Sequence, residues 1–100
     1  MIIVSQDKEL ILNFENIEAI GIGNPLEDDD GMFKVLASTT SDNEYTLGKY
    51  VTEERAKEVL QEIIKEYRLT EITKATINRV SDDVGALAIK EVFVYEMPED

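Results

Sequence analysis

The segment 52–68 constrains the fold most strongly, because it carries the one strong amphipathic helical pattern of the chain. Thr52 precedes Glu53 and Glu54, an order typical of a helix start, where a hydroxyl caps the first turn and carboxylates face the positive end of the helix dipole. Apolar residues then recur at spacings of three, one, three, one and three, which place them on one stripe of a helix. The stripe comprises Ala56, Val59, Leu60, Ile63, Ile64 and Tyr67.

Short strands are predicted before this helix, from the alternation of apolar and polar residues. In the second of them, Leu10, Leu12 and Phe14 share one face, and Glu9, Ile11 and Asn13 share the other. Residues 5–8, 24–31 and 40–43 have the composition of turns or loops. The predicted strands cover 1–5, 9–14, 17–23, the segment from 33 to the turn at 40–43, and 44–51.

The fifth strand is predicted to present Tyr45, Leu47 and Val51 on one face. Beyond Arg68 the pattern weakens, and 69–80 is left open between a short helix, an extended segment and a loop. A turn is expected at 81–85. Segment 92–97 is clearer and predicts a last strand, which joins the sheet or pairs with another subunit.

These elements predict an α+β fold in a single domain, 1–100. An antiparallel sheet of five or six strands, built from an N-terminal meander, packs on the helix at 52–68. One hundred residues suffice for one hydrophobic core.

Charge restricts the partners of the chain. Ten basic and twenty-two acidic side chains give a net charge of -12, and this field repels phosphate and anionic lipid. Nucleic acid and membrane surfaces are therefore not expected as direct partners. With no cysteine there is no disulfide framework, and no signal-peptide pattern or long apolar run occurs, so we expect a cytoplasmic protein.

The acidic run 27–30, followed by Gly31, is the densest charge cluster. A calcium loop with Gly31 at its sixth place would put Leu26 and Ala37 where carboxylates are needed, so we expect a solvated loop, and whether it binds a cation stays open. Gly21 and Gly23 resemble the start of a phosphate-binding loop, but the third glycine is missing and no helix follows.

No catalytic set is selected by the sequence. Histidine and cysteine are absent, and neither Ser5 with Lys8, nor Ser38 or Ser41 with Lys49, has a spacing that indicates a dyad. We therefore predict no enzyme activity, no catalytic, cofactor-binding or metal-binding residues, and no cofactor.

Aromatic residues could form a platform for single-stranded nucleic acid, but such platforms are flanked by basic residues, and here Lys49 and Arg68 are isolated. Packing in the core or an interface is the preferred interpretation of these rings. They are Tyr45, Tyr50, Tyr67, Phe93 and Tyr95.

A surplus of apolar surface is expected once the helix covers one sheet face. A partner protein or a second copy would hide it, which predicts a non-enzymatic protein-interaction module that forms a homo-oligomer. The alternative is an acidic mimic of nucleic acid that inhibits a DNA-binding protein; a small hydrolase or metal-dependent enzyme is the third hypothesis. The residues expected on the surplus face are Ile3, Ile11, Leu36, Tyr50, Phe93 and Tyr95.

Three segments, 1–8, 45–64 and 94–100, resemble a group of small uncharacterised acidic proteins of Gram-positive bacteria and their prophages. The resemblance covers about half the chain and excludes the acidic loop and 69–90. It implies a cytoplasmic, phage-derived protein and brings no activity or site residues. The meander and helix are also similar to part of a pleckstrin-homology-like half-barrel, although a strand after the helix departs from that pattern.

Overall fold

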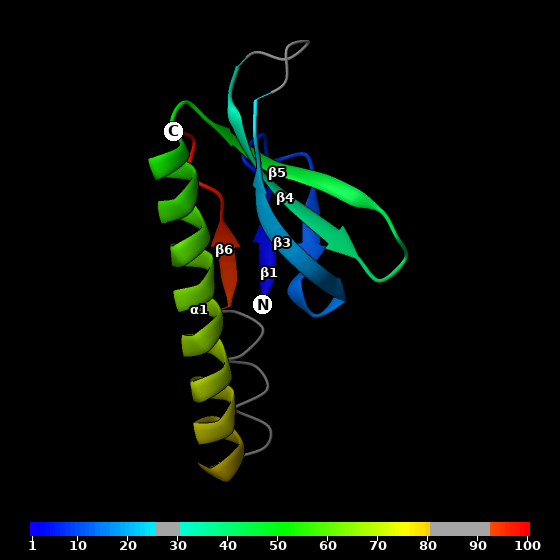
Figure 1. Cartoon of the computed structure of the whole chain (residues 1–100). Helices are drawn as coiled ribbons and strands as arrows, with labels where there is room; N and C mark the ends of the chain where they lie inside the picture. The colour runs from blue at the N-terminus through cyan, green and yellow to red at the C-terminus, as the bar shows by residue number, and fades with distance from the viewer. Residues whose placement is uncertain (26–30, 81–92) are drawn as a thin grey trace.

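The computed structural model describes residues 1–25, 31–80 and 93–100, with side chains omitted at 76–80. Within these residues the chain is α+β, as predicted, with one long helix beside a set of short strands (Figure 1). The elements are β1 (Ile2–Val4), β2 (Ile11–Asn13), the 3-10 turn η1 (Phe14–Asn16), β3 (Ile17–Gly23), β4 (Phe33–Thr39), β5 (Glu44–Tyr50), α1 (Glu53–Val80) and β6 (Val94–Glu96).

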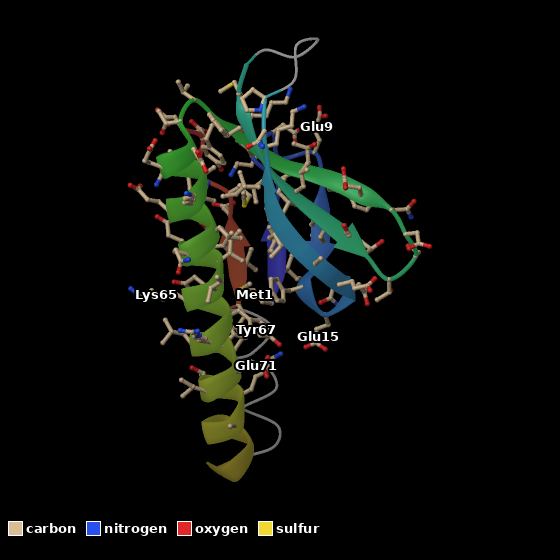
Figure 2. All side chains as sticks on the ribbon, viewed as in Figure 1. Met1, Glu9, Glu15, Lys65, Tyr67 and Glu71 are labelled. Atoms are coloured by element: carbon tan, nitrogen blue, oxygen red, sulfur yellow. The ribbon has the colours of Figure 1, made fainter. Side chains whose placement is uncertain are left out.

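Helix α1 buries the predicted stripe. Ala56, Val59 and Ile63 are fully buried, and the other three stripe residues are half-buried. Thr52 caps the helix by accepting a hydrogen bond from the Arg55 amide at 3.1 Å. In Figure 2, Tyr67 lies on the side of α1 that faces the strands and Lys65 lies on the opposite side. The prediction for this helix start and this stripe is confirmed.

The predicted end of the helix near Arg68 is wrong, because α1 continues to Val80. A ring contact just before the predicted end and an ion pair beyond it join α1 to η1. The Tyr67 ring stacks on Phe14 with ring centroids 4.4 Å apart, and Lys74 Nζ lies 3.2 Å from a carboxylate oxygen of Glu15. These contacts join residues far apart in sequence, so the local pattern of 69–80 gives no sign of them.

The strands form two three-stranded sheets, in the orders β2-β1-β6 and β3-β4-β5, instead of the predicted single sheet. The hairpin β1-β2 and the meander β3-β4-β5 are antiparallel as expected, but η1 separates β2 from β3 and the meander does not run on. The similarity to a pleckstrin-homology-like half-barrel is not confirmed by this arrangement.

Strand β6 pairs parallel with β1, which the predicted antiparallel sheet did not include. Ile2, Ile3 and Val4 stand opposite Val94, Tyr95 and Glu96. The chain therefore returns after α1 and places its last strand beside its first. Residue 92 of the predicted strand, the turn at 81–85 and most of the loop at 24–31 lie outside the described residues.

The core lies where α1 meets the inward faces of both sheets. The helix contacts β3, β4 and β5, and β1 contributes Ile3 from the other sheet. The buried apolar residues are Met1, Ile3, Val35, Ala37, Leu47, Tyr50, Ala56, Val59, Ile63 and Met97.

A bulge in β5 changes which residues of that strand face the core. Val35 pairs with Gly48 and the next residue of β4 pairs with Thr46, so Leu47 is the extra residue of β5. Leu47 and Tyr50 are buried and Val51 is 76% exposed, so the prediction that Leu47 and Val51 share a face is wrong. One inserted residue reverses the alternation that follows it.

We expect Ile63→Ala to lower the free energy of unfolding by about 2 to 5 kcal/mol, because it opens a cavity beneath the helix. Ile72, on the same helix, is 64% exposed, and Ile72→Ala should change stability by no more than about 0.5 kcal/mol. Urea denaturation followed by circular dichroism measures both. Equal losses in the two variants would contradict the packing described here.

Candidate functional site

The residues considered for a catalytic dyad hold turns together. The Ser5 hydroxyl donates to an Asp7 carboxylate oxygen at 2.6 Å and accepts from the Leu10 amide at 3.0 Å. Lys8 Nζ points to Glu96, 3.7 Å away. Ser5 therefore stabilises the β1-β2 turn, and Lys8 links this turn to β6.

The second set of dyad candidates is also dispersed. The Ser41 hydroxyl lies in the β4-β5 turn, 3.0 Å from the Thr39 hydroxyl, whereas Lys49 is on β5 with its main chain bonded to Gln6. No three carboxylates converge as metal ligands within 1–25, 31–80 and 93–100. The acidic run 27–30 lies outside those ranges, so the open question of cation binding there is unchanged.

The five aromatic residues do not form a platform. Tyr50 is buried, and Tyr67, Phe93 and Tyr95 pack against the core. Tyr45 is half-buried on β5 and stands opposite Ala37. Gly21 and Gly23 lie in β3, not in a loop before a helix. No helix N-terminus stands at these glycines to bind phosphate.

The outward face of the sheet β2-β1-β6 carries three of the six exposed large apolar side chains in the described part of the chain. Opposite residues in a sheet point to the same side, so the register fixes this face. Ile2 stands beside Asn13 and Val94, and Val4 stands beside Ile11 and Glu96. We call Ile2, Val4, Ile11 and Val94 the outward patch.

Three of the four patch residues are exposed, and Val4 is half-buried. Ile11 is 66% exposed, Val94 is 48% exposed and Ile2 is 39% exposed. The two polar residues of the face are Asn13 and Glu96, and Glu96 is paired with Lys8. Four neighbouring apolar side chains with one compensated charge are unusual on a chain of net charge -12.

The sequence predicted a surplus apolar face but assigned the wrong residues to it. Ile3 and Tyr50 are fully buried, and Phe93 and Tyr95 pack on the core. Leu36 is half-buried on β4 of the other sheet, so Ile11 alone of the predicted six belongs to the patch. Ile3 stands opposite Leu12 and Tyr95, which both pack against the core, so the face of β1 that carries Ile3 is the core face. The prediction had placed Ile3 on the other face. The sequence alone could not show which residues of 2–4 and 94–96 face outward, because the parallel pairing of these two segments was not predicted.

A second cluster binds the C-terminal residues 98–100, and the sequence did not indicate it. Gln6 Nε2 donates to the Glu99 carbonyl at 2.6 Å and to the Lys49 carbonyl at 3.0 Å, while its Oε1 accepts from the Lys49 amide at 2.7 Å. The Gln6 main chain also donates to Leu47 at 2.8 Å. One residue thus caps the free edge of β5 and holds the tail.

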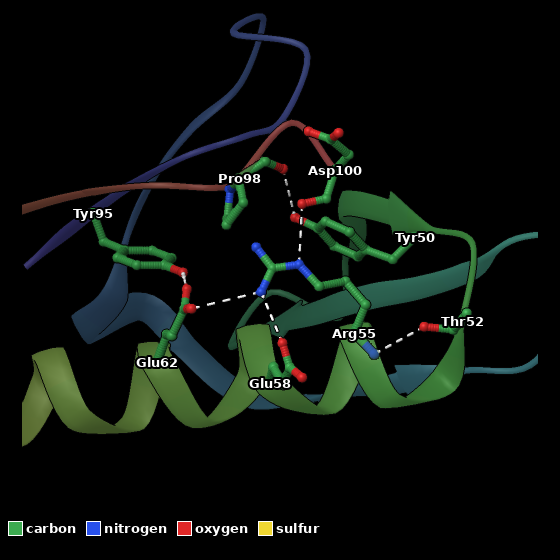
Figure 3. Close-up of polar contacts among 8 residues, drawn as sticks. All are labelled: Tyr50, Thr52, Arg55, Glu58, Glu62, Tyr95, Pro98 and Asp100. Atoms are coloured by element: carbon green, nitrogen blue, oxygen red, sulfur yellow. Dashed lines mark hydrogen bonds and ion pairs between the residues drawn. The ribbon is translucent and has the colours of Figure 1, made fainter.

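Tyr50 and Arg55 complete this cluster (Figure 3). The Tyr50 hydroxyl donates to the Pro98 carbonyl at 2.9 Å, and Arg55 Nε donates to the Asp100 carbonyl at 3.0 Å. The Tyr50 ring packs over Gly48, where an added Cβ would lie 2.8 Å from the tyrosine hydroxyl. We call Gln6, Tyr50 and Arg55 the tail clamp.

Acidic side chains of α1 orient the clamp and the strand beside it. Arg55 Nη1 lies 3.1 Å from Glu58 Oε2 and 3.7 Å from Glu62 Oε1, and the Tyr95 hydroxyl donates to Glu62 Oε2 at 2.8 Å. Burial, followed by the hydrogen bond to Glu62, raises the pKa of Tyr95 above its ordinary value. Burial also raises the pKa of Tyr50 to about 12.

Comparisons with protein-family models, with curated proteins and with solved structures found no match. The resemblance to small acidic proteins of Gram-positive bacteria therefore stays a prediction. In the described part of the chain, α1 included, no helix combines the length and apolar character needed to cross a membrane.

We expect Tyr50→Phe to lower the free energy of unfolding by about 0.5 to 1.5 kcal/mol at neutral pH, because one hydrogen bond to the tail is lost. The difference between wild type and variant should shrink as pH rises from about 10 to about 12. The unfolded phenol ionises near pH 10 whereas the folded one resists up to its pKa of about 12, so the unfolded state binds fewer protons in this window.

Urea denaturation of both proteins at several alkaline pH values measures that difference. Subtracting the variant removes the titration of lysines, which both chains share. A difference that stays constant from pH 9 to 12 would contradict a buried, neutral Tyr50 in the folded protein.

Proposed function

We propose that this protein is a non-enzymatic interaction module that binds a second copy of itself through the outward patch. The observation that carries the proposal is the exposed apolar face of the sheet β2-β1-β6, formed by Ile2, Val4, Ile11 and Val94. Its place in the cytoplasm and its phage origin rest on the sequence alone.

A second copy suits this face for two reasons. Sheets pack face to face through apolar side chains at a separation of about 10 Å, and a two-fold axis brings the same patch onto itself. The charged member of the face, Glu96, is paired with Lys8 in its own chain, so these two residues add no net charge to the repulsion between two copies of charge -12. Because the patch is small, we expect an affinity on the order of micromolar.

The substitution Ile11→Glu should weaken self-association about 10- to 100-fold, because it places a carboxylate in the apolar contact of both copies. Val51→Glu is the matched control, since Val51 is also well exposed, at 76% against 66% for Ile11, receives the same charge and lies outside the patch. Sedimentation velocity over a concentration series measures the dissociation constants. A wild type that stays monomeric, or equal weakening by both substitutions, would contradict the proposal.

Salt separates this proposal from the acidic-mimic alternative. Raising the sodium chloride concentration from about 0.05 M to about 0.5 M should strengthen self-association, because it screens the repulsion between two copies of charge -12. Binding of a mimic to a basic DNA-binding protein would weaken over the same range. Self-association that falls with salt would count against an apolar interface.

The mimic receives less support from the arrangement of charges. Its carboxylates would need to repeat along one face, and on α1 they are interleaved with cations. Glu53 pairs with Lys57 at 3.2 Å, and Arg55 engages Glu58. These pairs reduce the similarity to an uninterrupted line of phosphates.

A further inference from the structure

The C-terminal segment 93–100 is bound like a separate ligand by the first two thirds of the chain. Every hydrogen bond and ion pair described for it ends on a residue between 2 and 62. The Ile2 amide donates to the Phe93 carbonyl at 3.0 Å, and the Met97 amide donates to the Val4 carbonyl at 2.9 Å. The remaining partners are Gln6, Lys8, Tyr50, Arg55 and Glu62.

The tail clamp recognises backbone. Three consecutive carbonyls, those of Pro98, Glu99 and Asp100, each accept a hydrogen bond from a different side chain of the clamp. Just before them, the Met97 side chain is almost completely buried and anchors the segment in the core. A strand, an apolar anchor and a row of carbonyls together form the pattern by which sheet edges bind extended peptides.

Helix α1 runs on past the place where the segment 93–100 is bound. Glu62 contacts Tyr95, and α1 continues from there for eighteen residues to Val80, a rise of about 27 Å. Figure 1 shows this part of α1 extending past the ends of the strands.

We propose that the segment 93–100 of one copy occupies the β1 edge and the tail clamp of a second copy, so that the dimer exchanges its C-terminal strands. The inference rests on the proposed self-association. Exchange keeps every contact of the closed monomer, because each contact is made between the segment and residues 2–62 of whichever copy receives it. After exchange in both directions, each outward patch combines Ile2, Val4 and Ile11 of one copy with Val94 of the other.

A double cysteine variant tests the exchange, because the chain has no cysteine of its own. Ile3 and Tyr95 are opposite in the register of β1 and β6 on the core side of the sheet, so Ile3→Cys with Tyr95→Cys places two thiols on neighbouring strands and away from the outward patch. The dimer fraction is oxidised, or bridged by a short bismaleimide, and run on a denaturing gel without reductant. The single variants serve as controls for adventitious cross-linking.

The expected result is a covalent dimer from the double variant and uncrosslinked chain from each single variant. An internally bridged monomer obtained from a dimer fraction would overturn the exchange and leave the self-association intact. A wild type that is monomeric at all concentrations would overturn both.

Gln6→Ala in the otherwise wild-type chain, which has no cross-link, gives a second readout. It removes two side-chain hydrogen bonds within the β5 edge and one to the tail, so an exchanged dimer should dissociate at least about tenfold faster. Dimer dissociation at an unchanged rate would place the segment 93–100 outside the dimer contact.

Discussion

In the described part of the chain, the apolar stripe of one helix faces six strands, which present more sheet surface than the stripe covers. Ala56, Val59 and Ile63 are buried where α1 meets β3, β4 and β5, and Ile3 reaches the same core from the second sheet. Burial of a large apolar side chain contributes about 1.5 to 3 kcal/mol, so this seam holds the two sheets together. The outward face of β2-β1-β6 stays uncovered and keeps Ile11, Ile2 and Val94 in contact with water.

The pairing of the first and last strands explains where this uncovered face lies. Strand β1 is central in its sheet because β6 returns to it after α1, and its alternate residues then divide between core and outside. The tail clamp holds the residues that follow β6 by hydrogen bonds to the carbonyls of residues 98–100. The polar contacts of Gln6 and the apolar burial of Met97 thus support one arrangement of strands.

Local patterns in the sequence predicted the elements well. The stripe of 52–67, the strand at 17–23, the turn at 40–43 and the alternation of Leu10 and Leu12 with Ile11 all depend on neighbours in sequence. The division into two sheets, the parallel pair and the extension of α1 depend on distant contacts. Phe14 with Tyr67 and Lys74 with Glu15 are examples that no local period contains.

In the candidate site, single residues were also assigned to the wrong face, because the bulge and the strand register depend on contacts that are distant in sequence. An interaction face was expected, but a bulge at Leu47 moved Tyr50 into the core, and the register of β1 moved Ile3 inward and Ile2 outward. The clamp residues carry no sequence signal, since a glutamine in a turn and an arginine in a first helical turn are ordinary. Their role appears only when the tail lies between them.

Amide hydrogen exchange measured at low and high protein concentration tests most directly whether the uncovered face is the interface. The account predicts that protection rises with concentration in β1, β2 and β6 and stays constant along the outward side of α1. Protection that is independent of concentration, or that rises in β3 or α1 alone, would contradict it.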